Sequence, residues 1–155
     1  EDGIKTKLEL LSSYSSCDVA DALLKLNYPH GGYLPDIIMF SPEQQAGSSK
    51  LVGPVFTVKV VPISDTTSPK PTQHFADASP EGSVVFVSAP SSLYYISLVW
   101  YTGYILMELF SLFSDAINAV WGGLMNTRAK VRGVKGVVVD GRIRDLAEIR
   151  GDGLP

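Results

Sequence analysis

Apolar and polar residues alternate along this chain with two periods, one typical of helices and one typical of strands. Apolar residues at every third or fourth position predict a helix over Ile4 to Leu11. Three residues that often cap helices, Ser15, Ser16 and Asp18, precede a second predicted helix, from Val19 to Leu26. A shorter helix is predicted over Gln73 to Ala78.

Runs of apolar and β-branched residues predict the strands, which are Leu34 to Phe40, Leu51 to Val61, Ser83 to Ala89 and Gly136 to Val139. The last two are apolar almost throughout, as in a sheet that is covered on both faces. With the helices, these strands predict an α/β domain in which helices are layered on a mixed sheet.

The stretch from 119 to 155 combines a turn, a helix and a strand in a fixed order. Gly122 and Gly123 form a turn that opens an amphipathic helix from Leu124 to Val131, and Gly133 is its expected C-cap. The expected inward face holds Val120, Leu124 and Val131, and the outward face holds Arg128, Lys130 and Arg132. A charged turn, 140–145, follows the last strand, and Asp145 can cap a final helix from Leu146 to Arg150.

This arrangement suits a small anionic ligand. Backbone N–H groups at the helix start after Gly122 and Gly123 attract an anion. The guanidinium of Arg144 can hold a carboxylate through two hydrogen bonds, and the carboxylate of Asp145 can hold a hard divalent cation. Each feature also has a purely structural interpretation, as a tight packing point or as a helix cap with a surface ion pair.

Two motifs carry a resemblance to a known family. The sequences WGGLMNTRAK at 121–130 and GVKGVVVDGRIRDLAEIR at 133–150, followed by GLP, are similar to those of the ribonuclease E regulator A-like (RraA-like) proteins. CDVADALLKL, LVGPVFTVKVVP and PEGSVVFVSAP agree more loosely. The family includes class II 4-hydroxy-4-methyl-2-oxoglutarate aldolases, which also decarboxylate oxaloacetate. The resemblance implies a β/β/α swivelling-domain fold and a homotrimer with sites between subunits.

The resemblance also implies roles for particular residues. Asp145 is the expected ligand of Mg²⁺ or Mn²⁺, partly through water, and Arg144 is expected to pair with a 2-oxo acid substrate. The turn formed by Gly122, Gly123, Leu124 and Met125 is expected to hold the substrate carboxylate with backbone N–H groups. Aldol cleavage and decarboxylation both form the enolate of pyruvate, whose charge a divalent cation stabilises. Arg144 and Asp145 are therefore the predicted catalytic residues.

Position 123 departs from the family pattern. Many of the aldolases have an acidic residue there, which is thought to hold or activate a metal-bound water, and Gly123 has no side chain to do so. Decarboxylation of oxaloacetate depends less on an acidic residue at this position, because loss of CO₂ generates the enolate without a base. Family members continue after the sequence GLP into another strand, so we expect this chain to be truncated at its C-terminus. A further acid, given by a neighbouring subunit in the family, is expected to lie in that missing part.

The segment from about 91 to 117 interrupts the resemblance. Residues Leu93 to Phe113 are as long as a membrane span and contain one charged residue, Glu108. Three interpretations compete: a membrane helix, a buried helix or lid, and an insertion foreign to the family architecture. The third is favoured, with a retained intron as one hypothesis for its origin.

Composition narrows the class of protein and its partners. The chain has 155 residues, 45% of them hydrophobic and 19% charged, which predicts one globular domain over 1–155. A net charge of −3 gives no electrostatic case for nucleic-acid binding. Cys17 is the sole cysteine, which excludes an intrachain disulfide and a cysteine-based zinc site. We expect a cytoplasmic protein, because no secretion leader is visible. We expect no membrane partner, because the segments that flank 91–117 look like two parts of one folded domain.

The resemblance, together with the residues at the glycine turn and the Arg-Asp pair, predicts a divalent-metal lyase for 2-oxo acids. Two alternatives stay open: a non-catalytic protein-binding module, like the ribonuclease E inhibitors of the family, and a non-functional product of a mis-annotated gene.

Overall fold

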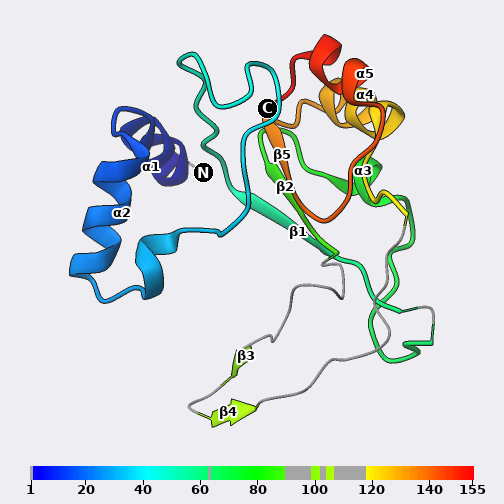
Figure 1. The fold of residues 1–155 in the computed structure, drawn as a ribbon, viewed down its shortest axis with the longest axis horizontal. Helices are drawn as coiled ribbons and strands as arrows, with labels where there is room; N and C mark the ends of the chain where they lie inside the picture. The colour runs from blue at the N-terminus through cyan, green and yellow to red at the C-terminus, as the bar shows by residue number, and fades with distance from the viewer. Residues whose placement is uncertain (1, 63, 90–98, 102–103, 107–117) are drawn as a thin grey trace.

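The computed structural model describes residues 2–62, 64–89, 99–101, 104–106 and 118–155 (Figure 1). The helices are α1 (Asp2–Ser12), α2 (Ser16–Lys25), the 3₁₀ turn η1 (Pro29–Gly32), α3 (Phe75–Ala78), α4 (Gly123–Val131) and α5 (Leu146–Asp152). The strands are β1 (Val55–Lys59), β2 (Val84–Ser88), β3 (Val99–Tyr101), β4 (Tyr104–Leu106) and β5 (Gly136–Asp140).

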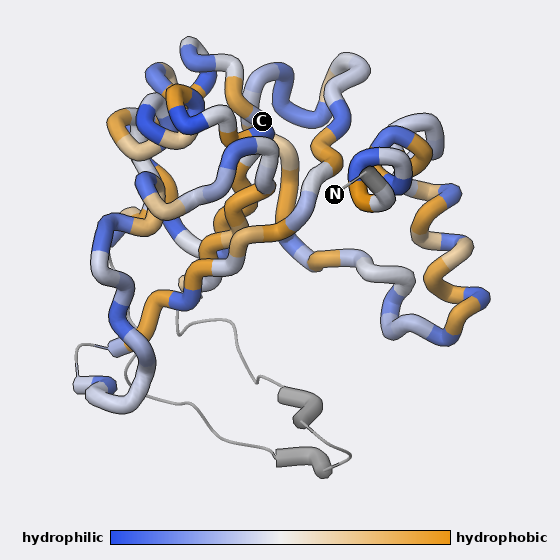
Figure 2. Tube along the Cα trace, turned by 180° about the vertical axis from the view of Figure 1, so that it is seen from behind, coloured by the Kyte–Doolittle hydropathy of each residue, from blue (hydrophilic) through white to orange (hydrophobic). Residues whose placement is uncertain are grey.

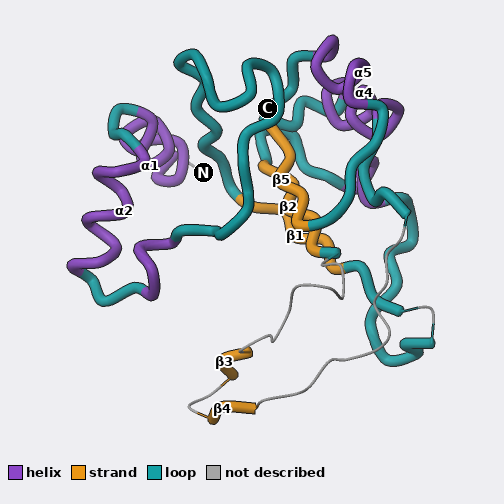
Figure 3. The backbone as a smooth tube through the Cα atoms, viewed as in Figure 1, coloured by secondary structure: helices purple, strands orange, loops and turns teal. Residues whose placement is uncertain are grey.

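A three-stranded parallel sheet, in the order β1-β2-β5, forms the centre of the fold. Its middle strand, β2, is the most buried, as its continuous apolar run predicts. In Figure 2 the apolar colouring follows these strands, and Figure 3 shows the helices α3, α4 and α5 gathered on one side of them. The buried core residues are Val85, Val87, Trp121, Ala129, Val134, Ile149 and Leu154. The chain is therefore α/β, as expected, but this sheet is parallel throughout where a mixed sheet was predicted.

The N-terminal helices lie apart from this core. Figure 1 shows α1 and α2 on the opposite side of the sheet from α4 and α5. Helix α2 begins with a capping box, in which Ser15 accepts from the N–H of Asp18 and the Asp18 carboxylate accepts from the N–H of Ser15. This confirms the predicted cap. No residue of α2 is buried, so capping and local bonds, rather than core packing, define this helix.

Several predicted elements are confirmed with shifted ends, and one is wrong. The strand predicted over Leu51 to Val61 is shorter and follows Pro54, and the short helix predicted over Gln73 to Ala78 begins at Phe75. Leu34 to Phe40 is not a strand. A turn at Pro35 and Asp36 interrupts it, with Asp36 in the left-handed region at φ 61°.

The predicted buried face of α4 is also wrong. Leu124 is 72% exposed and Val131 is 81% exposed, whereas Asn126 and Ala129 are buried. The helix rotates this way because Asn126 finds hydrogen-bond partners in the interior. The predicted end is confirmed, since Gly133 follows the C-cap Arg132 with a left-handed φ of 76°.

Most of the apolar segment 91–117 lies outside the described residues. Its described parts are β3 and β4, which pair antiparallel. Among the helices of the described ranges, none has both the length and the apolarity that crossing a bilayer requires.

Candidate functional site

A short parallel contact joins the two motifs of the C-terminal stretch. The N–H of Val120 donates to the carbonyl of Arg142 (2.9 Å), and the N–H of Arg144 donates to the carbonyl of Trp121 (3.0 Å). Trp121 and Ile143 form an isolated parallel β-bridge between these two bonds. The buried indole of Trp121 fixes this contact in the core. Because the pairing is in register, the residues that follow on each segment meet: the glycine pair and the Arg-Asp pair.

The predicted site residues Gly122, Gly123, Arg144 and Asp145 are therefore neighbours. Asp145 Oδ2 accepts a hydrogen bond from the N–H of Gly123 (3.1 Å), the first residue of α4. Arg144 Nε lies 3.6 Å from the same carboxylate oxygen. The guanidinium side chain is 73% exposed, so most of it is open to a ligand. A carboxylate, a cation and a helix start thus converge at one point on the surface.

Gly122 is required by space rather than by conformation. Its φ of −159° is extended and open to any residue. A Cβ at this position, however, would lie 2.7 Å from Asp145 Oδ2 and 3.0 Å from Arg144 Cγ. The Arg-Asp pair thus rests directly on the backbone of this glycine, which is the close approach that glycine permits.

Asp145 acts on α4 rather than on its own helix. It occupies the N-cap position of α5, as predicted, but its side chain makes no cap bond there. Its backbone is left-handed, at φ 60° and ψ 45°, a conformation in which aspartate is enriched among non-glycine residues. This turn points the carboxylate at the N–H of Gly123. The prediction of a side-chain cap on α5 is therefore wrong, and the carboxylate serves α4 instead.

Leu124 and Met125 continue the first turn of α4. The Leu124 side chain is on the surface, whereas Met125 is half-buried and packs against the core cluster. By helix geometry the N–H groups of the first turn have no acceptor within the helix. Asp145 takes the first of them, at Gly123, and the helix dipole favours an anion beside the next.

A polar network behind the turn, buried at Trp121 and Asn126 and open to solvent at Asp152, was not predicted. Trp121 Nε1 donates to Asn126 Oδ1 (3.2 Å), and Asn126 Nδ2 donates to Asp152 Oδ2 (3.0 Å). Thr127 Oγ1 donates to the same oxygen (2.9 Å). The hydrogen bonds from Asn126 and then Thr127, with the charge of Lys130, hold the pKa of Asp152 below its ordinary value. The network ties the start of α4 to the end of α5.

Glu148 is a further residue of the site that the sequence motifs do not indicate. A Cβ on Gly123 would lie 1.9 Å from Glu148 Oε2 and 2.9 Å from Glu148 Cβ. The glutamate carboxylate therefore lies against the bare backbone of Gly123, beside Asp145. The position of Glu148 in the first turn of the helix that follows Asp145 is the signal in the sequence that could have indicated it.

Asp145 has the chemistry of a magnesium or manganese ligand. Its contacts to Gly123 and Arg144 both use Oδ2, so Oδ1 remains for a cation. Magnesium in proteins is commonly held by one or two carboxylates, with water and ligand oxygens completing the shell. Within the described residues there is no cluster of three or more His, Cys, Asp or Glu side chains that could hold a metal. The residues fit a hydrated cation shared with a ligand, and not a cage made of protein alone.

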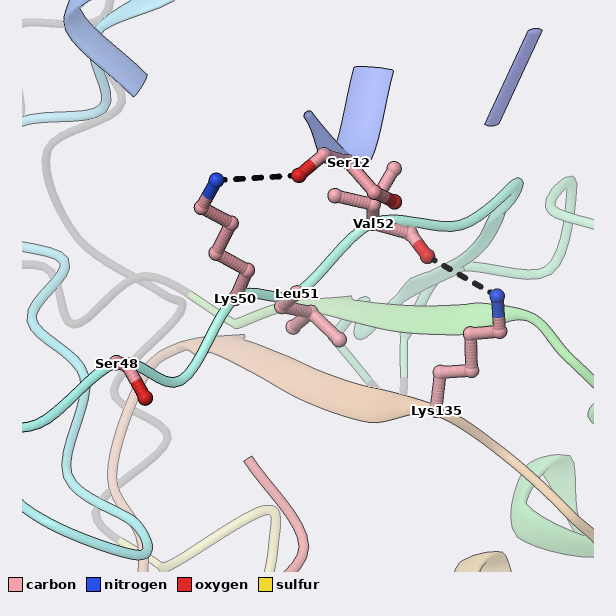
Figure 4. Close-up of a pocket in the computed structure, with 6 residues that line it drawn as sticks. All are labelled: Ser12, Ser48, Lys50, Leu51, Val52 and Lys135. Carbon is pink, nitrogen blue, oxygen red and sulfur yellow. Dashed lines mark hydrogen bonds between the residues drawn. The ribbon is translucent and has the colours of Figure 1, made fainter. Parts of the chain in front are cut away.

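A separate surface pocket of about 370 Å³ is lined by Ser12, Ser48, Lys50, Leu51, Val52 and Lys135 (Figure 4). Lys50 Nζ donates to the carbonyls of Ser12 and Tyr14, and Lys135 Nζ donates to the carbonyl of Val52. Both ammonium groups thus bind backbone carbonyls, and Lys50 ties the end of α1 to the loop before β1. None of the predicted site residues lines this pocket.

Comparison with known proteins identifies relatives of this chain. A family model described as "RraA-like: Aldolase/RraA" matches residues 16–155. A solved structure of an uncharacterized protein from Pseudomonas syringae pv. tomato is 23% identical, with a TM-score of 0.63 over 97% of this chain and 56% of that one. Streptomyces coelicolor RraAS2, described as an unusual member of the RNase ES inhibitor RraA protein family, is 23% identical, with a TM-score of 0.54 over 92% of this chain and 57% of that one.

A 33-residue stretch is 54% identical to an uncharacterized protein of Methanocaldococcus jannaschii and covers 21% of this chain and 16% of that protein. The chain thus spans just over half the length of the solved structures that it resembles. At these identities the structural likeness shows a shared fold.

Proposed function

This chain belongs to the RraA-like family, and we propose that it is a divalent-metal-dependent lyase that acts on 2-oxo acids through the enolate of pyruvate. The reaction is aldol cleavage of 4-hydroxy-4-methyl-2-oxoglutarate, decarboxylation of oxaloacetate, or both. The observation that carries the proposal is the convergence of the Gly122-Gly123 turn with Arg144 and Asp145 across the parallel bridge. Both reactions need this combination, because a carboxylate must be bound and an enolate charge stabilised.

Each site residue has a distinct task. The exposed guanidinium of Arg144 binds the substrate carboxylate through two hydrogen bonds. The first-turn N–H groups of Leu124 and Met125 bind a carboxylate oxygen and are preorganised by the helix. Asp145 holds the cation through Oδ1 while Oδ2 fixes the start of α4. When bound, Mg²⁺ or Mn²⁺ supplies Lewis-acid stabilisation of the enolate charge.

The assembly is part of the same proposal. We propose a homotrimer with each site at a subunit boundary, the β/β/α swivelling-domain layering, and a cytoplasmic location. In this view the exposed Arg144 side chain faces a neighbouring subunit across the substrate.

A decarboxylation assay tests the proposal. Purified protein with Mg²⁺ is expected to convert oxaloacetate to pyruvate above the metal-only rate, and Asp145→Ala is expected to lower the enzymatic rate by at least about 100-fold. Asp21→Ala, which removes an exposed carboxylate on α2, is the matched control and keeps full activity. Equal rates for the wild type and Asp145→Ala would refute the proposal.

The second candidate function is a non-catalytic protein-binding module. It is favoured by one observation, the similarity to RraAS2, whose description names an RNase ES inhibitor family. Protein without oxaloacetate turnover, with and without metal, that lowers the activity of a ribonuclease E preparation would support this candidate and exclude the lyase.

A further inference from the structure

We infer that Glu148 is a catalytic residue of this site, the group that moves the proton between solvent and the methyl carbon of pyruvate. This inference rests on the proposed lyase function. It starts from the contact between Glu148 and Gly123, which neither of the two sequence motifs reveals.

The position of the carboxylate is set by two elements. Asp145 is the N-cap of α5 and Glu148 lies in the first turn of that helix, and both carboxylates reach the glycine turn at the start of α4. A Cβ on Gly122 would meet Asp145 Oδ2 at 2.7 Å, and a Cβ on Gly123 would meet Glu148 Oε2 at 1.9 Å. Each carboxylate therefore rests on one glycine of the turn, and Glu148 lies where a side chain at position 123 would begin.

The chemistry requires such a group. In oxaloacetate decarboxylation the C3–C4 bond breaks, CO₂ leaves, and the electron pair of that bond forms the C2–C3 double bond of the enolate. The enolate then takes a proton at C3 to become pyruvate. The guanidinium of Arg144 does not release its protons at neutral pH, and Asp145 is committed to Gly123 and to a cation. Gly123 has no side chain. Glu148 is exposed, beside the turn and without another assigned task.

A proton from solvent passes through the Glu148 carboxylate to C3 of the enolate, so each decarboxylation consumes one solvent proton and leaves Glu148 as it began. In the reverse direction the Glu148 carboxylate removes a methyl proton from pyruvate and forms the enolate. Wild-type protein with Mg²⁺ in D₂O is therefore expected to exchange the methyl protons of pyruvate for deuterium, which proton NMR measures directly.

Glu148→Gln keeps the size of the side chain and removes the acid. We expect it to lower the exchange rate by at least about 100-fold, the contribution typical of a positioned acid or base. Binding of Mn²⁺ with oxalate, a mimic of the enolate, is expected to stay within about twofold of wild type by calorimetry. A merely structural role would weaken binding and exchange together. Glu81→Gln is the matched control, because Glu81 contacts Gly133 at the other end of α4 in the same manner.

An exchange of the two residues gives a second test. In Gly123→Asp/Glu148→Gly the carboxylate is carried by position 123, and position 148 has no side chain. The 2.9 Å approach between a Cβ at 123 and the Cβ of Glu148 is therefore avoided. We expect this variant to regain at least a tenth of the wild-type deuterium exchange. Gly123→Asn/Glu148→Gly, which has the same shape without the acid, is expected to stay inactive. Thermal unfolding of each variant separates loss of exchange from loss of folding.

The outcomes distinguish the two proposals. Wild-type protein that neither binds Mn²⁺ with oxalate nor exchanges pyruvate protons overturns the lyase function, and this inference with it. Wild-type protein that does both, with Glu148→Gln exchanging equally fast, overturns the inference alone.

Discussion

Truncation of Asn126 to alanine tests how the candidate site is held in place. Asn126 is 2% exposed, and its side chain links Trp121 on one side to Asp152 on the other. Asn126→Ala removes the acceptor of the Trp121 indole N–H, which is itself buried at 2% exposure. The turn that holds Gly122 and Gly123 lies between Trp121 and Asn126 in sequence, so its position depends on this bond.

The magnitude follows from the unpaired donor. Leaving a buried donor without an acceptor costs about 1–3 kcal/mol, so we expect Asn126→Ala to lower the free energy of unfolding by about 2 kcal/mol. For a chain of this size that corresponds to a fall in Tm of about 4–8 °C. The bond to Asp152 adds little, because Thr127 still donates to the same oxygen at a site reached by water.

Urea unfolding followed by Trp fluorescence measures this change. Val131→Ala is the control, because Val131 lies on the same helix at 81% exposure and is expected to change the free energy by less than about 0.5 kcal/mol. Asn126→Asp keeps the acceptor for Trp121 but turns a second carboxylate toward Asp152, so it is expected to be destabilising at neutral pH and less so in acid. An Asn126→Ala variant as stable as Val131→Ala would refute the reasoning.

Three further predictions concern the surroundings of the site. The pKa of Asp152 is lower in the folded than in the unfolded chain, so the ionised carboxylate stabilises the fold above about pH 4. This contribution is lost as the pH falls through the folded pKa. The free energies of unfolding of wild type and Asp152→Asn, measured against pH, should therefore converge in acid. Arg128 forms a two-pronged ion pair with Asp77 of α3 in which both side chains are over a third exposed, so Arg128→Ala should cost less than about 1 kcal/mol in urea unfolding, and less still in high salt. Gly122→Ala should leave Tm nearly unchanged, because the atoms that the new methyl group would meet belong to side chains that can move. The same variant should weaken Mn²⁺-oxalate binding, measured by calorimetry, because the Asp145 carboxylate must move.

The sequence predicted those elements whose cause is local. The cap of α2 follows from Ser15 and Asp18, and the central strand follows from the apolar run of 84–88. The strand predicted over Leu34 to Phe40 is wrong, because apolar residues alone do not form a strand where a turn breaks the run. Local pattern thus identified the helices and most strands and gave their ends to within a few residues.

The orientation of α4 depended on partners distant in sequence. A hydropathy pattern places Leu124 and Val131 inside and Asn126 outside, and the structure reverses this. The amide of Asn126 is buried because Asp152, on another helix, satisfies it. No pattern within α4 contains that information. The same holds for the meeting of Gly123 with Asp145, which depends on a single β-bridge between segments 22 residues apart.

The two motifs of the site therefore act as one structural unit. The glycine pair is explained by the side chains that rest on it, and not by the backbone conformation of Gly122 itself. The position of the Asp145 carboxylate is in turn explained by the N–H that Gly123 offers. A larger residue at position 122 or 123 must displace the side chain of Arg144, Asp145 or Glu148, and a shorter residue at 148 leaves room for a side chain at 123. Substitutions that exchange volume between the turn and the start of α5 should consequently be less damaging than the sum of their separate effects, which is the coupling that contacting residues show.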